Sequence, residues 1–286
     1  MKTIKYEKKR NKIDVRIDIL RYALLIICAI PMILPLIWMI SVALQSGESI
    51  FTTTPQWIPK EFNWSNFSEA FERIDFFSKF INTLIITVVS TIGQVLSCTL
   101  VAYSLSRINF KGRKVWFLLI IASMMLPPFV SIIPVFKLFS SIGWYDTWWP
   151  LIVPAFLGGS FNIFLLRQYM MGIPKSYDEA ARIDGANHLQ ILFKIILPMC
   201  KPAVICIIIM AVQGAWNDYL APLIYLKSQD KWTLSLAMAQ FSGEYATSWN
   251  LFMAADLIYM LPMVILFLSL QKYFMDGLGS LNSVGK

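Results

Sequence analysis

The sequence contains little charge, one histidine and none of the common catalytic motifs, and these shortages exclude several classes of protein. Only 15% of its 286 residues are Asp, Glu, Lys or Arg, whereas a soluble domain carries roughly 25%. No His-Glu-x-x-His, Gly-x-Ser-x-Gly or Gly-x-x-x-x-Gly-Lys-Ser/Thr motif occurs. We therefore expect no catalytic residue, no bound metal and no nucleotide loop in this chain, and we exclude a soluble enzyme.

Cysteine is scarce as well, and its placement excludes a disulfide framework or a zinc site. None of the four cysteines belongs to a Cys-x-x-Cys pair. All of them lie in or beside apolar runs: Cys28, Cys98, Cys200 and Cys206. This pattern is typical of buried thiols that act as small hydrophobic side chains.

What the sequence does contain is apolar residues, which make up 57% of the chain. They gather in runs long enough to cross a hydrocarbon core of about 30 Å, and in lipid such runs must be helical to satisfy their own amides. The runs cover residues 22–44, 81–103, 115–138, 148–169, 203–226 and 251–272. We predict an all-α, polytopic membrane protein with six transmembrane helices, in which prolines such as Pro127 and Pro128 kink the third.

Basic residues predict the orientation of these helices. If the N-terminus is cytoplasmic, the inner segments hold 19 of the 25 Lys and Arg residues, so the positive-inside rule places both termini in the cytoplasm. Residues 1–21 then form a basic cytoplasmic segment, 22–272 the membrane domain and 273–286 a cytoplasmic tail. The net charge of +8 is thereby explained by topology and contact with anionic lipid, and we expect no nucleic acid partner.

The loop between the fourth and fifth runs, within residues 170–201, contains the strongest local signals. Ser176 followed by Glu179 resembles a capping box, which predicts the start of a short helix. Ala180 and Ala181 would give that helix a small, smooth face. Gly185 can adopt a positive φ and end the helix after about two turns. Such a helix either simply connects two spans or seats in a groove of a partner protein.

These residues also match a family pattern. Glu179-Ala180-Ala181, then Gly185, then nine residues and Ile195-Ile196-Leu197-Pro198 resembles the EAA loop of inner-membrane permeases in binding-protein-dependent ABC importers. Trp216-Asn217-Asp218 and the segment after Gln271-Lys272-Tyr273-Phe274 resemble the carbohydrate-uptake branch, in particular its smaller, maltose-type second permease.

The resemblance implies a type I importer with several partners. A second permease subunit would complete the path, two cytoplasmic ATPases would bind ATP and Mg²⁺, and an extracytoplasmic solute-binding protein would deliver the substrate. The loop at 227–250 would touch that binding protein, and the tail at 275–286 would approach the ATPases. The residues implied in ATPase coupling are Ser176, Tyr177, Asp178, Glu179, Ala180, Ala181, Asp184 and Gly185.

Two carboxylates inside predicted spans are candidates for the substrate path, because ionisable groups in lipid are costly. Asp218 and Asp256 are both expected in the outer half of the membrane. The first is accompanied by Gln213, Trp216, Asn217 and Tyr219. Together they predict a polar, aromatic-lined vestibule suited to a sugar. Alternatively, both carboxylates hold helix ends or partner subunits in place.

Other classes of protein remain as alternatives. A permease for a non-sugar solute would share every feature above. A secondary transporter or channel would usually show internal repeats, and we find none that is convincing. A membrane enzyme would need clustered His, Asp or Glu residues, and the single histidine of this chain argues against such a cluster.

Overall fold

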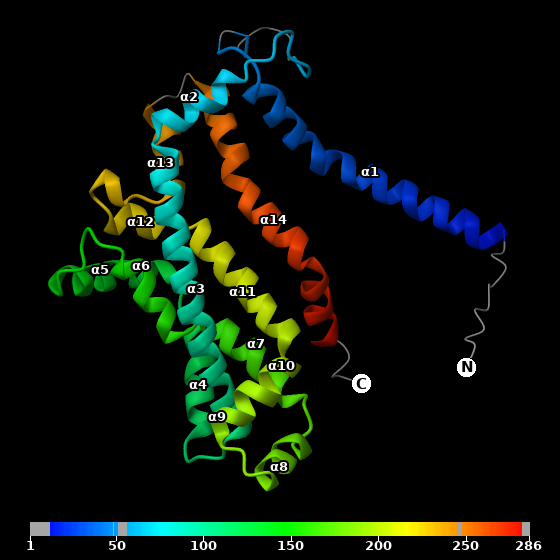
Figure 1. Ribbon diagram of the computed structural model, residues 1–286, viewed down its shortest axis with the longest axis vertical. Coiled ribbons are helices and arrows are strands. Elements are labelled where there is room, and N and C mark those ends of the chain that lie inside the picture. The colour runs from blue at the N-terminus through cyan, green and yellow to red at the C-terminus, as the bar shows by residue number, and fades with distance from the viewer. Residues whose placement is uncertain (1–11, 48, 51–55, 245–247, 282–286) are drawn as a thin grey trace. The chain divides into compact units, whose positions relative to one another are not determined.

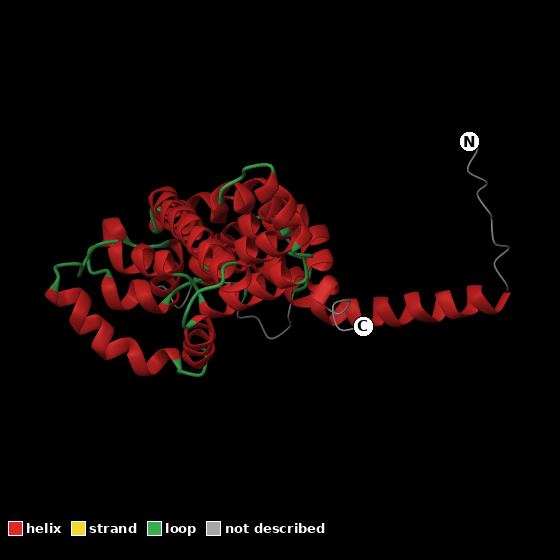
Figure 2. Ribbon diagram, turned by 90° about the horizontal axis from the view of Figure 1, so that it is seen from below, coloured by secondary structure: helices red, strands yellow, loops and turns green. Residues whose placement is uncertain are grey.

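The computed structural model describes residues 12–47, 49–50, 56–244 and 248–281. All regular structure in these residues is helical (Figure 2). The longer helices are α1 (Lys12–Ala43), α2 (Ser65–Arg73), α3 (Phe76–Arg107), α4 (Arg113–Ser123), α5 (Ile132–Ser141), α7 (Ser160–Met171), α8 (Ser176–Ile183), α11 (Lys201–Trp216), α13 (Leu234–Glu244) and α14 (Trp249–Leu281). The shorter ones are α6 (Trp149–Ile152), α9 (His188–Ile191), α10 (Leu197–Met199), α12 (Leu220–Tyr225), the 3₁₀ turns η1 (Pro128–Ser131), η2 (Val153–Leu157) and η4 (Gln229–Lys231), and a π-helical turn, η3 (Leu192–Ile196).

Four helical stretches are long and apolar enough to cross a membrane: Asp18–Ala43, Phe76–Arg107, Trp149–Met171 and Trp249–Lys272. A fifth is reached if His188–Met199 and Lys201–Trp216, which meet at 85°, count as one broken span. The chain is therefore a multi-pass membrane protein. The count of six spans and the cytoplasmic position of both termini remain predictions.

The single helix predicted over residues 115–138 is wrong. Helix α4 ends at Ser123, and the chain turns before η1 and α5. The turn coincides with Pro127 and Pro128, whose rings remove backbone donors and disfavour helix at the preceding residue. With 11 residues, α4 is only about 16 Å long, so the prolines break this segment rather than kink it.

Two other predicted boundaries need correction. The fifth run was expected to be helical through residue 226, but α11 ends at Trp216 and α12 begins only at Leu220. The predicted tail at 273–286 is in large part a continuation of α14, which runs to Leu281. The predicted loop at 227–250 contains the helix α13. Residues 1–11 and 282–286 of the predicted terminal segments lie outside the described residues.

The chain divides into two compact units, of which the first comprises residues 1–70 and 245–257. Its described part is tied together by amide side chains beyond the end of α1. Asn66 donates to the carbonyl oxygens of Ala43 (2.8 Å) and Gln45 (2.8 Å), and Asn250 donates to Asn66 Oδ1 (3.0 Å). These buried bonds satisfy carbonyl groups at a helix end, which would otherwise lack partners.

The second unit comprises residues 71–244 and 258–286, and α3 is its central helix. Helix α3 packs along α7 and α11 (Figure 1). Its buried face is rich in small and hydroxyl side chains such as Thr83, Thr87 and Ser90, which let membrane helices approach closely. At Gly93 the ring of Phe156 lies so near the backbone that a Cβ atom would overlap it.

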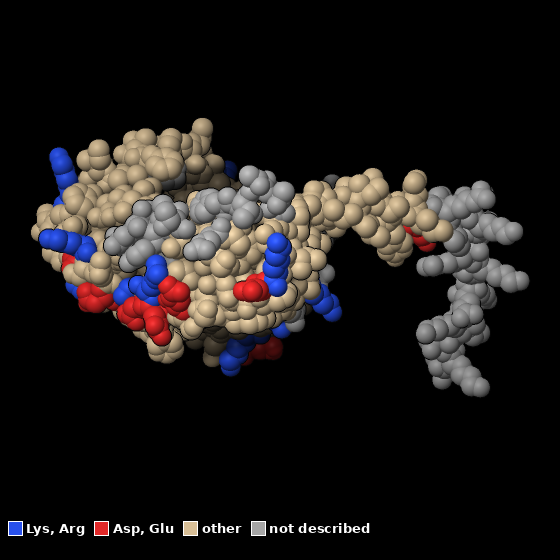
Figure 3. Space-filling view, turned by 90° about the horizontal axis from the view of Figure 1, so that it is seen from above, with Lys and Arg blue, Asp and Glu red and all other residues tan. Residues whose placement is uncertain are grey.

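Charge is sparse on the molecular surface as well. On the face shown in Figure 3, Lys, Arg, Asp and Glu side chains form a few small groups, and other residue types cover most of the described surface. Large apolar side chains such as Leu20 and Met32 on α1 are exposed within this chain. That exposure fits a protein whose surface is covered by lipid and by partner subunits.

Candidate coupling loop and outer site

Helix α8 begins where the sequence predicts, but without the predicted capping box. The residue preceding the helix is Lys175, and no side chain caps the first turn. Ser176 is already helical, and the amides of Asp178 and Glu179 donate instead to the carbonyl oxygen of Lys175 (2.9 and 3.1 Å). Asp178 and Glu179 lie in the first turn, where the partial positive charge of a helix N-terminus favours carboxylates.

The predicted end of α8 is confirmed. Gly185 has a φ of +79°, and the amide of Ala186 donates to the carbonyl oxygen of Ala181 (2.9 Å). This bond spans five residues and closes the helix in the way typical of a glycine stop. Apart from its two neighbours in the chain, no described residue has an atom within 4 Å of a Cβ built on Gly185, so conformation rather than space requires glycine there.

A genuine capping box occurs a few residues later, at a position that sequence reasoning missed. Asn187 Oδ1 accepts a bond from the amide of Gln190 (2.9 Å), and the amide of Asn187 donates to Gln190 Oε1 (2.9 Å). The Asn-x-x-Gln spacing was the available signal. This box starts α9 immediately after the glycine stop, so the turn between α8 and α9 is well defined.

The eight predicted coupling residues divide between an exposed face and a buried one. Asp178 and Ala181 are buried against the rest of the second unit. The others are exposed: Ser176, Tyr177, Glu179, Ala180, Asp184 and Gly185. A groove of about 460 Å³ runs beside this face, lined by Ser176, Tyr177, Ala180, Ala181, Asp184, Ala186 and Ile195. The small side chains of the two alanines keep the groove open.

Among the predicted path residues, Trp216 and Asn217 are tied to α14. Trp216 stacks on Tyr259, with ring centroids 6.0 Å apart. Trp216 Nε1 donates to the carbonyl oxygen of Tyr259 (3.3 Å), and the Tyr259 hydroxyl donates to the carbonyl oxygen of Trp216 (3.1 Å) and to Asn217 Oδ1 (2.9 Å). Asn217 is exposed, whereas Trp216 is buried. The indole ring of Trp216 therefore packs between helices, and the side-chain amide of Asn217 is left at the surface.

The remaining predicted path residues are only partly brought together. Asp218 is half-buried, and its Oδ1 accepts a bond from the amide of Ala221 (3.2 Å), so the carboxylate caps the start of α12. Gln213 and Tyr219 are exposed nearby. Asp256 belongs to the first unit and Asp218 to the second. That the two carboxylates line one vestibule remains a prediction.

The segment around Asp146 was missed by sequence reasoning. Asp146 adopts a φ of +58°, a conformation that aspartate tolerates better than most residues. Its Oδ1 accepts bonds from the amides of Lys227 and Ser228 (both 2.9 Å), and its Oδ2 accepts from the Ser228 hydroxyl (2.5 Å) and from Lys231 Nζ (3.0 Å). The Ser228 hydroxyl and amide, together with Lys231 and the Lys227 amide, hold the pKa of Asp146 well below its usual range.

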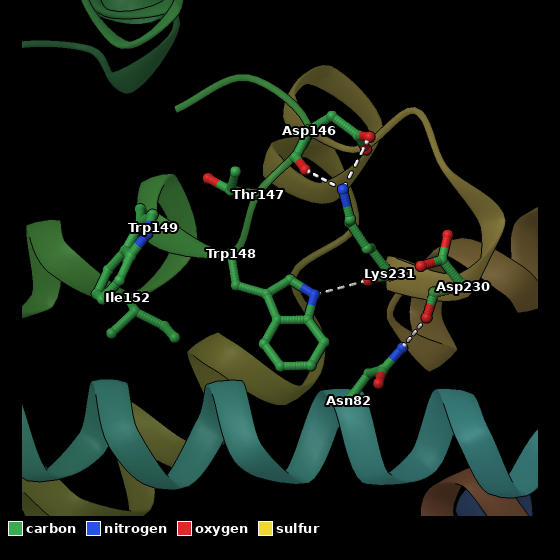
Figure 4. A pocket seen from close by; sticks show the side chains of 8 residues that line it. All are labelled: Asn82, Asp146, Thr147, Trp148, Trp149, Ile152, Asp230 and Lys231. Atoms are coloured by element: carbon green, nitrogen blue, oxygen red, sulfur yellow. Dashed lines mark hydrogen bonds and ion pairs between the residues drawn. The ribbon is translucent and has the colours of Figure 1, made fainter. Parts of the chain in front are cut away.

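Next to this carboxylate lies a pocket of about 500 Å³ (Figure 4). Trp148 Nε1 donates to the carbonyl oxygen of Lys231 (2.9 Å) across it, and the side-chain amide of Asn82 donates to the carbonyl oxygen of Asp230 (2.7 Å). The pocket is lined by Asn82, Asp146, Thr147, Trp148, Trp149, Ile152, Asp230 and Lys231. Three segments far apart in sequence thus form one hydrogen-bonded surface.

The chain resembles known transport proteins over most of its length. The sequence profile of the family described as "Binding-protein-dependent transport system inner membrane component" matches residues 98–279. The chain is 40% identical over 231 residues to the melibiose/raffinose/stachyose import permease protein MelC of Bacillus subtilis (strain 168), covering 79% of this chain and 83% of MelC. It is 32% identical to the arabinooligosaccharides transport system permease protein AraQ of the same organism, covering 77% of this chain and 78% of AraQ.

A solved structure has the same fold. It is the crystal structure of a bacterial ABC transporter involved in the import of the acidic polysaccharide alginate. The match has a TM-score of 0.79 at 27% sequence identity and covers 93% of this chain and 99% of that chain.

Proposed function

Because the chain belongs to the family of inner membrane components of binding-protein-dependent transport systems, we propose that it forms, with a second permease subunit, the path of an importer for an oligosaccharide. It is a carbohydrate permease subunit of an ABC transporter, as its relatives and its fold indicate. Its substrate in this proposal is a short sugar chain of the kind named for MelC and AraQ. The membrane is the cytoplasmic membrane of a prokaryote.

The exposed face of α8 is proposed as the contact with a cytoplasmic ATPase. One observation carries this role: a short helix with four exposed coupling residues lies beside an open groove, and the turn that ends it adds two more, including a glycine with positive φ. Glu179 is exposed in the first turn and is available to accept charge-assisted bonds from a partner, each worth about 1.5–3 kcal/mol. ATP and Mg²⁺ are bound by the ATPase chains in this proposal, and hydrolysis takes place there.

The mechanism is a shift between two conformations of the spans. ATP binding can drive that shift only if the ATPase binds one conformation more tightly than the other. Moving a population from 1:99 to 99:1 needs roughly 5.5 kcal/mol of differential affinity. Closure of an ATPase dimer around nucleotide is the proposed source of that energy, and α8 is the part of this chain that receives it.

On the opposite side of the membrane, the segment at 227–250 is proposed as the contact with a solute-binding protein. Asp146 supports this role because it fixes the amides of Lys227 and Ser228 and the ammonium group of Lys231. A docking surface that is rigid before binding loses less conformational entropy when a partner arrives. The exposed Asn217, Gln213 and Tyr219, with Asp218, are proposed to line the sugar path.

The proposal is tested by purifying a tagged copy of the chain from its native membrane in a mild detergent. We expect a second permease, an ATPase and a binding protein to co-purify, and vesicles containing this complex to take up labelled raffinose or arabino-oligosaccharide only when ATP is present. Uptake without any ATPase would contradict the proposal. Uptake of a non-sugar solute alone would retain the permease and overturn the carbohydrate assignment.

A further inference from the structure

Arg107, the last residue of α3, joins three helices around the coupling loop. Its Nη1 lies 3.0 Å from Asp178 Oδ2 in α8. Its Nη2 donates to the carbonyl oxygens of Met170 (2.6 Å) and Ile173 (2.9 Å), at the end of α7. The two charged side chains are 3% and 7% exposed. One guanidinium therefore binds the start of α8 and the end of α7 to the end of α3.

A second contact joins α3 to the same loop at a point that follows α8 in the chain. The hydroxyl of Tyr103 lies 3.2 Å from Nδ1 of His188, the first residue of α9. Tyr103 and Arg107 are four residues apart and so lie on one face of α3. This face holds the chain both before and after the exposed part of α8.

The Arg107–Asp178 pair is better explained by orientation than by stability. Burying two charges costs much of what their attraction returns, and an apolar pair of similar size often stabilises a fold equally well. A planar guanidinium with three acceptors, however, fixes direction as well as distance. An apolar contact would allow α8 to slide, whereas this pair holds it at one position on α3.

The covalent path from α8 to the next span is less direct than the contact of α8 with α3. The chain passes through α9 and the π-helical turn Leu192–Ile196, and it then bends by 85° before α11. A displacement that followed only this path would be absorbed in part by the turn and the bend. Helix α3, by contrast, has 32 residues in one continuous element, about 48 Å long.

The other end of α3 holds the outer segment that carries the pocket of Figure 4. The side-chain amide of Asn82 donates to the carbonyl oxygens of Asp230 (2.7 Å) and Trp232 (3.0 Å). The hydroxyl of Thr83 accepts a bond from the amide of Leu234 (2.7 Å). A single helix is therefore fastened to the coupling loop at one end and to residues 230–234 at the other.

We propose that Arg107 is a positioning residue that makes α8 and α3 move as one body, so that displacement of α8 by the ATPase reaches the outer segment 230–234. This inference rests on the coupling role proposed above for α8. The Arg107–Asp178 pair transmits the movement, while the exposed residues of α8 receive it. Docking of the ATPase and transmission of its motion are therefore separable functions of the same loop.

The test uses the complete complex purified through a tag on this chain. An environment-sensitive fluorophore is attached to Phe77→Cys, at the exposed outer end of α3, in a Cys28→Ser background because Cys28 is the exposed cysteine among the described residues. Addition of a non-hydrolysable ATP analogue should change the emission of the otherwise unmodified complex. In Asp178→Asn that change should be lost, although the ATPase still co-purifies and still hydrolyses ATP.

Two further variants separate transmission from folding. Asp178→Asn leaves a buried guanidinium without its carboxylate and is expected to lower the thermal midpoint of the complex. Adding Arg107→Gln removes the unpaired charge but also the bonds to the carbonyl oxygens of Met170 and Ile173, so the midpoint should recover in part while the emission change stays absent. Lys111→Gln, which removes an exposed cation from the turn after α3, is the matched control and should behave as the unmodified complex.

The outcomes distinguish this inference from the proposed function. A full emission response in Asp178→Asn, or recovery of the response together with stability in the double variant, would overturn the role of Arg107. An otherwise unmodified complex that binds ATP without any emission change would also overturn it. Failure of the ATPase to co-purify with the unmodified chain would instead reject the coupling role of α8.

Discussion

At the scale of single residues, Gly185 shows how one backbone angle defines the end of α8, the candidate coupling helix. Its φ of +79° lies in the left-handed region, which costs roughly 1–2 kcal/mol for a residue with a Cβ atom. The surrounding space is open, so substitution there perturbs conformation and not packing. The end of α8, and with it the position of Asp184, depends on this glycine.

We predict that Gly185→Val lowers ATP-dependent uptake and weakens ATPase docking, while the chain still inserts into the membrane. A β-branched residue cannot adopt this angle without strain. Gly185→Asn is the matched control, because asparagine tolerates the left-handed region, and it should retain most uptake. The measurements are transport in vesicles and ATPase recovery on a tagged complex. Normal transport by the valine variant would argue against a coupling role for this turn.

Asp218 lies where it can serve either the sugar path or helix packing, and one substitution separates the two roles. Its carboxylate binds backbone amides at the start of α12, among them that of Ala221 (3.2 Å), and the side chain is only half-buried, so a sugar hydroxyl group can approach it. We predict that Asp218→Ala reduces sugar uptake more than it reduces recovery of the assembled complex. Asp218→Asn keeps an acceptor for the Ala221 amide and serves as the control for helix capping. Dissociation of the alanine variant in detergent would favour packing.

At the scale of elements, residues 227–231 are held by a carboxylate from another part of the chain. Asp146 joins the turn before α6 to the turn after α12 through four donors. Hydrogen bonds to the ionised form lower its pKa, which means that folding is coupled to ionisation of this group. The ionised Asp146 stabilises the fold at pH values above about 3.9, the pKa of aspartate in an unfolded chain. This stabilisation is lost as the pH falls through the lower pKa that Asp146 has in the folded protein.

We therefore predict a pH-dependent difference in thermal midpoint between the unmodified protein and Asp146→Asn in detergent. At pH 7 the asparagine variant should unfold at a lower temperature, because a neutral amide cannot match the charge-assisted bonds from Lys231 and Ser228. The difference should shrink as pH is lowered below about 3.9, where carboxylates begin to protonate. Asparagine tolerates the positive φ of this position, so the comparison isolates the charge. A difference that is constant with pH would contradict the assignment.

Elements also show where sequence reasoning succeeded and failed. The apolar runs around α1, α3, α7 and α14 were predicted, because length and hydropathy alone decide whether a helix can cross lipid. The break between α4 and α5 was underestimated as a kink. Consecutive prolines remove donors from one turn and restrict the residue before it, and the outcome depends on whether neighbouring helices compensate.

At the scale of the whole molecule, the spans are incompletely covered by their own chain. The most apolar windows of the four qualifying spans are 0%, 39%, 33% and 17% buried. Such surfaces are stable in lipid or against another subunit, which agrees with a permease that works as one part of a larger assembly. The first unit, with its exposed α1, and the second unit, built around α3, each retain their own hydrogen-bonded connections.

The sequence by itself determined the membrane class, and its Glu-Ala-Ala…Gly motif indicated the family by resemblance. Hydropathy and that motif are both local in the chain. Only the tertiary structure decided that Asp178 turns inward to Arg107 and that Asp146 binds residues 227–231. Those partners are 71 and more than 80 positions apart, and pairing at such separations depends on how the helices pack, which no local pattern encodes.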